Sequence, residues 1–147
     1  MQLFIKNFDE LSTRELYDIL RARAEVFVVE QNCPYQDLDL KDLGAYHLYM
    51  KEEGEIVAYL RVLDRGVSYD TGSIGRVITT SRGRGRGLGL ELVLEGIRIA
   101  RERFGLDRLT ISAQKYAVGF YERAGFVRTD KEYLEDGIPH VEMHLEM

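Results

Sequence analysis

The chain is poor in the features that secreted and membrane proteins need. Cys33 is the single cysteine among 147 residues, so no disulfide can form within the chain, as is typical of a reducing compartment. No apolar run approaches the length of a membrane span, and the opening residues, Met1 to Lys6, lack the long apolar segment of a signal peptide. We therefore expect a soluble, cytoplasmic protein without membrane contacts.

An excess of positive charge is also missing. Lys and Arg number 20 against 25 Asp and Glu, a net charge of -5, which argues against general nucleic-acid binding. Acidic residues are concentrated between Glu30 and Glu55, where basic residues are few. We expect this part of the chain to attract a cation, through Glu30, Asp37 or Asp39.

The hydrophobic pattern predicts one domain over residues 1–147. Strands are expected at 1–8, 46–50, 56–63, 77–80, 109–113, 126–133 and 138–146, and helices at 12–28, 90–104 and 116–124. Ser12 and Glu15 have the spacing of a capping box at the first helix. Leu94 belongs to the apolar face expected for the second. This order predicts an α/β (α+β) fold, a mixed sheet flanked by helices.

A glycine-rich loop joins the strand at 77–80 to the helix that follows it. Glycines alternate with other residues at Gly83, Gly85, Gly87 and Gly89, which permits positive φ and close approach of a ligand to the backbone. The free N–H groups and positive dipole of the following helix favour a phosphate at this place. A solvated basic turn is the alternative interpretation, since arginines alternate with these glycines.

Two motifs identify a family. Arg84, Gly87 and Gly89 form R-x-x-G-x-G, which resembles the coenzyme A pyrophosphate loop of the GNAT acyltransferase superfamily. The segment 114–126 resembles its second signature, Phe-Tyr followed after three residues by Gly-Phe. Within the superfamily, segments 30–35 and 135–143 are similar to those of the ElaA group of N-acetyltransferases.

The resemblance implies a strongly twisted mixed sheet whose strands at 77–80 and 109–113 splay apart to admit pantetheine. It implies that the backbone of Ile78, Thr79 and Thr80 pairs with the pantetheine amides, with an N–H near Ile78 for the oxyanion. Gln114 would reach the pantetheine arm, and Tyr121 would be both a cofactor contact and the general acid. The pyrophosphate would be held by Arg84, Gly85, Arg86, Gly87, Leu88, Gly89 and Leu90.

The general base is left open by the sequence. Many family members place a glutamate on the central strand, but 73–77 has no carboxylate here. Glu30, His140 and His47 are the candidates; the imidazole of His140 suits proton transfer near neutral pH, although a histidine on a strand is often structural. Cys33 has no neighbouring base in the sequence, and is more simply explained by packing.

The resemblance implies transfer of an acetyl group from acetyl-CoA to a primary amine, without a metal, and allows a homodimer. Two alternatives remain open. Segment 23–27 is similar to the N-terminal helix of acyl-homoserine-lactone synthases, although the intact coenzyme A loop argues against that activity. An acyl-CoA-sensing module without catalysis is the other, and Tyr121 argues against it.

Overall fold

The structure is a computed structural model that describes residues 1–147. Strands and helices alternate in the expected order, with additional short helical turns at 8–10, 25–30, 41–44 and 115–117. The main elements are β1 (Gln2–Asn7), α1 (Thr13–Ala24), β2 (Tyr46–Glu52), β3 (Glu55–Leu63), β4 (Ser73–Thr79), α2 (Leu88–Phe104), β5 (Arg108–Gln114), α3 (Val118–Arg123), β6 (Val127–Glu135) and β7 (Ile138–Glu146).

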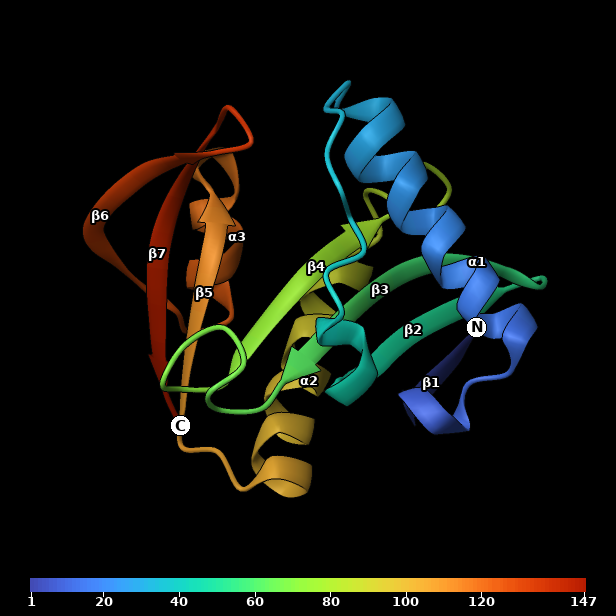
Figure 1. Ribbon diagram of the computed structural model, residues 1–147, viewed down its shortest axis with the longest axis horizontal. Coiled ribbons are helices and arrows are strands. Elements are labelled where there is room, and N and C mark those ends of the chain that lie inside the picture. The colour runs from blue at the N-terminus through green and yellow to red at the C-terminus, as the bar shows by residue number, and fades with distance from the viewer.

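The strands form two antiparallel sheets that meet at one point. The first has the order β1-β2-β3-β4 and the second β5-β7-β6. They are joined by a parallel bridge between Gly72 and Leu109, where the Thr110 amide donates to the Gly72 carbonyl at 2.9 Å. Beyond this bridge β4 and β5 diverge, which Figure 1 shows as a V that opens towards the top. The predicted mixed, splayed sheet with flanking helices is confirmed.

Helix α2 packs across the first sheet and covers the main core (Figure 1). Its buried face includes Leu92, Val93 and Ile99. At Gly96 a Cβ atom would come within 3.2 Å of Leu60 and Ile74, so a glycine lets the helix lie close to β3 and β4. Leu94, which we expected on this face, is 51% exposed; the face follows Leu92 and Val93 instead.

Helix α1 begins at the predicted capping box. The Glu15 amide donates to Ser12 Oγ at 3.0 Å, and the Ser12 amide donates to Glu15 Oε1 at 2.9 Å. The helix does not continue as an α-helix to residue 28, because residues 25–30 wind as a π-helical turn. This turn carries Val26 and Phe27 to the cavity between the sheets, and π-helical turns of this kind often mark functional sites.

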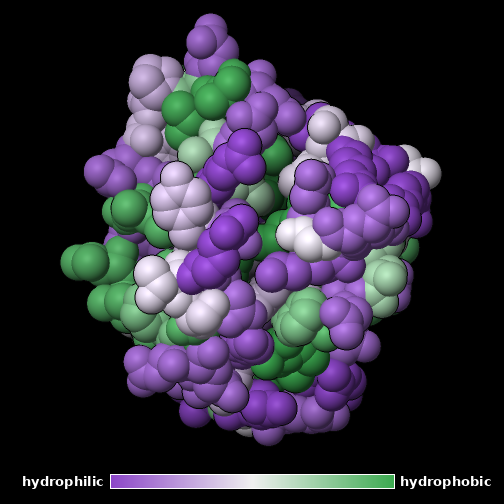
Figure 2. Space-filling view, turned by 90° about the vertical axis from the view of Figure 1, so that its right-hand side faces the viewer, coloured by the Kyte–Doolittle hydropathy of each residue, from purple (hydrophilic) through white to green (hydrophobic).

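The molecular surface on the α1 side is mainly hydrophilic, with hydrophobic residues in small separate patches (Figure 2). None of the helices has both the length and the apolar character required to cross a bilayer.

Candidate active site

A cavity of about 550 Å³ opens where β4 and β5 separate. Its walls come from the π-helical turn and the loop after it, β4, the glycine-rich loop, β5, α3 and the β6–β7 turn. Phe120 and Tyr121 lie on one wall, and His140 and Glu135 on another. Because the open edge of β4 forms part of the cavity, backbone hydrogen-bonding groups are available to an extended ligand.

A bulge in β4 determines which of its backbone groups face the cavity. The β3–β4 register shifts between Tyr59 and Arg61, and Arg76 has a φ of 51°. Past the bulge, the Thr80 amide donates to the Val57 carbonyl at 3.0 Å, so the backbone hydrogen-bonding groups of Thr80 point to β3. The backbone groups of successive residues in a strand point alternately to its two edges. Those of Ile78 therefore also point to β3, whereas those of Val77 and Thr79 point to the open side.

This corrects two predictions. The backbone of Thr80 is used within the protein, because its carbonyl also accepts from the Gly83 amide at 2.9 Å. An N–H of Ile78 directed at β3 is likewise unsuited to an oxyanion in the cavity. Val77 and Thr79, whose backbone groups point to the open side, both line the cavity.

The glycine-rich loop has the conformation that its sequence predicts. Gly85 and Gly87 have φ values of 73° and 74°, and a Cβ on Gly83 would overlap the Val57 carbonyl. Gly87 is the N-cap of α2 and supplies no side-chain cap. The amides of Leu88, Gly89 and Leu90 are therefore free at the positive end of a 17-residue helix.

The side chains of the three arginines in this loop point to different parts of the structure. Arg82 donates to Glu53 at 2.9 Å and Arg86 to Glu52 at 2.6 Å, so both side chains are engaged by the β2–β3 turn. Arg84 lines the cavity and forms an ion pair with Glu30. Both Arg84 and Arg86 are thus paired with a glutamate, but of the two only Arg84 lines the cavity, where its side chain could leave Glu30 for a pyrophosphate.

Tyr121 lies on the cavity wall with its ring held by two aromatic neighbours. Its ring centroid is 5.0 Å from that of Phe120 and 6.0 Å from that of Phe126, both edge-on. The hydroxyl makes no hydrogen bond within the protein. Burial, and then the nearby Tyr116, raise the pKa of Tyr121 above its usual value of 10.0, so the phenol stays protonated and available as a donor.

The two candidate histidines have different surroundings. His140 lines the cavity, with Nδ1 2.7 Å from the Ile138 carbonyl oxygen and Nε2 3.3 Å from Glu135 Oε2. His47 lies in the core, where its ring nitrogens meet the Tyr59 hydroxyl at 2.7 Å and the Asp42 carbonyl at 2.9 Å. Burial lowers the pKa of His47. His47 is therefore a structural residue and not a base for this cavity.

Comparison with known proteins agrees with this geometry. The family model described as an acetyltransferase (GNAT) domain matches residues 12–147. The chain belongs to the GNAT acetyltransferase family. A UPF0039 protein of Schizosaccharomyces pombe is 39% identical over 100% of this chain and 98% of its own. Escherichia coli ElaA is 38% identical over 94% of this chain and 92% of its own.

Solved structures of the family superpose closely on this GNAT domain. The crystal structure of an acyl-CoA N-acyltransferase from Pseudomonas aeruginosa has a TM-score of 0.91 at 40% identity and covers 98% of both chains. That of Escherichia coli ElaA has a TM-score of 0.91 at 35% identity and covers 99% of both. The resemblance to the GNAT superfamily and its ElaA group is confirmed.

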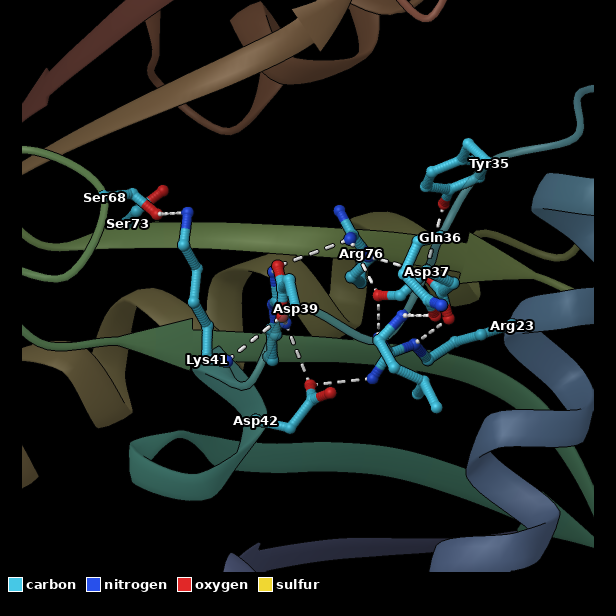
Figure 3. Close-up of polar contacts among 12 residues, drawn as sticks. Arg23, Tyr35, Gln36, Asp37, Asp39, Lys41, Asp42, Ser68, Ser73 and Arg76 are labelled. Carbon is cyan, nitrogen blue, oxygen red and sulfur yellow. Dashed lines mark hydrogen bonds and ion pairs between the residues drawn. The ribbon is translucent and has the colours of Figure 1, made fainter.

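Ion pairs join three arginines and three aspartates in a compact Arg–Asp cluster, which borders the cavity of this GNAT domain through Arg76. Its members are Arg23, Arg61, Arg76, Asp37, Asp39 and Asp42. Figure 3 shows how Arg23 and Arg76 meet the aspartates. Asp37 accepts from Arg23 at 2.9 Å and from Arg76 at 2.8 Å, and Asp39 accepts from Arg61 at 2.6 Å. The expectation that Asp37 or Asp39 attracts a cationic acceptor is therefore wrong, because arginines already neutralise both carboxylates.

Residues 30–33 cross the mouth of the cavity and touch three of its walls. Glu30 pairs with Arg84 of the glycine-rich loop. The side-chain amides of Gln31 and Gln114 bond reciprocally at 3.3 and 3.4 Å, and the Cys33 thiol is 3.6 Å from the Asp136 carbonyl. These contacts engage Arg84 and Gln114, two of the side chains predicted to meet coenzyme A.

Two residues of this site had not been predicted as functional. Val77 depends on the bulge, and Glu135 on the β6–β7 turn that brings it to His140. A Glu-Asp-Gly turn is visible in the sequence, but only the pairing of β6 with β7 shows that Glu135 faces the cavity. No group of three or more His, Cys, Asp or Glu is arranged to hold a metal ion.

Proposed function

We propose that the protein transfers an acetyl group from acetyl-CoA to a primary amine by direct attack in a ternary complex. The observation that carries this proposal is the continuity of the cavity. One cavity between β4 and β5 is lined by Arg84 and Gly89, by Tyr121, and by His140. A thioester and an amine can therefore meet without leaving it.

The donor lies along the open edge of β4. Its pyrophosphate binds the free amides at the start of α2 together with Arg84, which leaves Glu30 to do so. Pantetheine extends beside Val77 and Thr79 as an added strand and meets Gln114. These β4 amides also supply the donor for the oxyanion of the tetrahedral intermediate.

The proton transfers fall to His140 and Tyr121. His140 is the base that this geometry favours, since it lines the cavity, whereas neither Glu30 nor His47 does. A thiol has a pKa of about 8.5, whereas that of Tyr121 lies above 10.0. Complete transfer of the phenolic proton to the thiolate is thus uphill, and Tyr121 acts mainly by a hydrogen bond that stabilises the departing sulfur.

A panel of amines with acetyl-CoA, scored by release of free thiol, tests the proposal. We expect release that depends on a primary amine and saturates with its concentration. Binding of acetyl-CoA without thiol release for any amine would instead indicate an acyl-CoA sensor and would refute the proposal. A cytoplasmic location and a homodimer remain predictions.

A further inference from the structure

Glu135 and His140 form a pair at the acceptor end of the cavity. Glu135 ends β6 and His140 lies on β7, so the β6–β7 turn places their side chains 3.3 Å apart, Oε2 to Nε2. The His140 side chain is 8% exposed and that of Glu135 is 52% exposed. Neither Glu135 nor its neighbour Asp136 has a lysine or arginine within ion-pair distance, unlike Asp37, Asp39 and Glu30.

The hydrogen bonds of His140 determine which nitrogen can accept a proton. Nδ1 lies 2.7 Å from the Ile138 carbonyl oxygen, and because a carbonyl only accepts, Nδ1 carries the hydrogen. In the neutral ring the lone pair is therefore on Nε2, on the side of Glu135. The Tyr133 ring stacks on the imidazole at 6.0 Å and 19°, which keeps the ring in this orientation.

We propose that Glu135 and His140 together are the subsite for the acceptor amine: Glu135 binds its ammonium group, and Nε2 of His140 removes a proton from it. This inference rests on the proposed function. An ammonium has three N–H donors, so one can point to each acceptor. The half-exposed Glu135 side chain can rotate outwards to give the ammonium room between them.

The proton balance of the reaction is complete with these groups. The alkylammonium gives one proton to Nε2, and the resulting imidazolium donates to Glu135. The free amine attacks the thioester carbon, and the C–S bond breaks as the C–N bond is established. The second proton of the nitrogen passes to the thiolate beside Tyr121, and the imidazolium proton leaves to solvent past the exposed Glu135. Thioester and alkylammonium thus become thiol, amide and one proton.

The charges at this end also define a class of acceptor. Two arginines near this end line the cavity: Asp37 and Asp39 engage the guanidinium of Arg76, and that of Arg123 lies over the Phe120 ring on α3. A carboxylate adjacent to the reacting amine, as in an α-amino acid, would thus lie beside the carboxylates of Glu135 and Asp136, which no lysine or arginine neutralises. We therefore infer an aliphatic amine without a neighbouring carboxylate, such as a lysine side chain or a polyamine.

Other titratable groups around His140 leave this assignment intact. Tyr133 stacks on it from β6 and hydrogen-bonds Ser112. Tyr69, from the β3–β4 loop, stays neutral because burial raises its pKa, with Tyr133 and Glu135 adding to the effect. Glu142, two residues along β7, is 3.1 Å from His144 and 3.5 Å from Lys131.

The first test compares butylamine with norvaline, which is butylamine with an α-carboxylate. With acetyl-CoA, we expect wild-type kcat/KM to favour butylamine at least tenfold. Glu135→Gln should raise the KM for butylamine about tenfold and reduce that preference, and Glu135→Asp should restore part of both. Glu132→Gln is the control, because Glu132 lies on the same strand, pairs with Lys115 and Arg128, and does not line the cavity.

The second test uses pH to separate a base from a structural histidine. His140→Asn should lower kcat about 100-fold at pH 7.5. Because only free amine then reacts, and an alkylammonium has a pKa of about 10.4, the variant's kcat/KM should rise about tenfold per pH unit up to pH 9.5. The wild-type value should stay nearly level. Unchanged acetyl-CoA affinity and melting temperature verify the fold of each variant.

Two outcomes overturn the inference alone: an unaltered butylamine KM in Glu135→Gln, or parallel pH profiles for His140→Asn and wild type. If the wild type released no thiol with any amine of the panel, the proposed function would be overturned, and this inference with it.

Discussion

Replacing Tyr121 by phenylalanine separates its chemistry from its packing. The ring lies edge-on to Phe120 and Phe126, 5.0 and 6.0 Å away, and phenylalanine keeps both contacts. The hydroxyl has no hydrogen-bond partner in the protein, so its removal leaves no buried group unpaired. We expect the free energy of unfolding to change by less than about 0.5 kcal/mol, which for a chain of this size is a melting shift of about 2 °C at most.

The effect on catalysis should be much larger. Loss of a positioned donor to the leaving thiolate costs about 100-fold in kcat, or about 2.7 kcal/mol of transition-state stabilisation. Steady-state thiol release and thermal melting on the same preparation measure both quantities. Tyr17→Phe is the matched control, since Tyr17 is 67% exposed on α1. An unchanged kcat, or a melting point lowered by many degrees, would remove Tyr121 from the mechanism.

Three further variants test other parts of the account. Gly87→Val should weaken acetyl-CoA binding at least about tenfold by calorimetry, because a residue forced to positive φ costs about 1–3 kcal/mol and distorts the loop; Gly54→Val, with a φ of 79° at the β2–β3 turn, should lose stability but not affinity. Glu30→Gln should tighten acetyl-CoA binding about two- to fivefold, since it frees Arg84 from an exposed ion pair, whereas Glu53→Gln, which removes one of the carboxylate partners of Arg82, should not. Asp42→Asn should destabilise the fold by about 3–5 kcal/mol in urea unfolding, because it removes the carboxylate that two buried arginines, Arg23 and Arg61, share. Burial alone would raise the pKa of Asp42, but Arg23 and Arg61 hold it below 3.8; its contribution is therefore full above about pH 4 and is lost as the pH falls through the lower folded value. A variant whose stability follows the wild-type acid profile would contradict this assignment.

Local sequence signals predicted most of the fold. Ser12 and Glu15 marked the start of α1, and the Gly85 and Gly87 positions required positive φ that the structure shows. Alternating hydrophobic residues located the strands. The sequence did not define the buried face of α2 as well, because Leu94 has the same helical spacing as residues that are buried. Packing of the helix against Leu60 and Ile74 determines which face is buried.

The sequence predicted the parts of the site that depend on local motifs, but not those that depend on strand register or on ion pairs between distant residues. Tyr121, Arg84 and His140 do line one cavity. The β4 bulge at Arg76, however, changes which backbone groups of the following residues point away from β3, so those of Val77 are directed to the cavity and those of Ile78 and Thr80 are not. Likewise the sequence suggests that Asp37 and Asp39 add negative charge to the site. In the structure this charge is neutralised by Arg23, Arg61 and Arg76, which come from three different elements.

The fate of the acetyl group tests the central claim most directly. Acetyl-CoA with a deuterated acetyl group can be incubated with protein and the best amine of the panel, and the products identified by mass spectrometry. We predict a deuterated N-acetyl amine in a one-to-one ratio to free coenzyme A, with no label retained on the protein. Label released only as acetate, or free thiol without any acetylated amine, would contradict acyl transfer to an amine in this cavity.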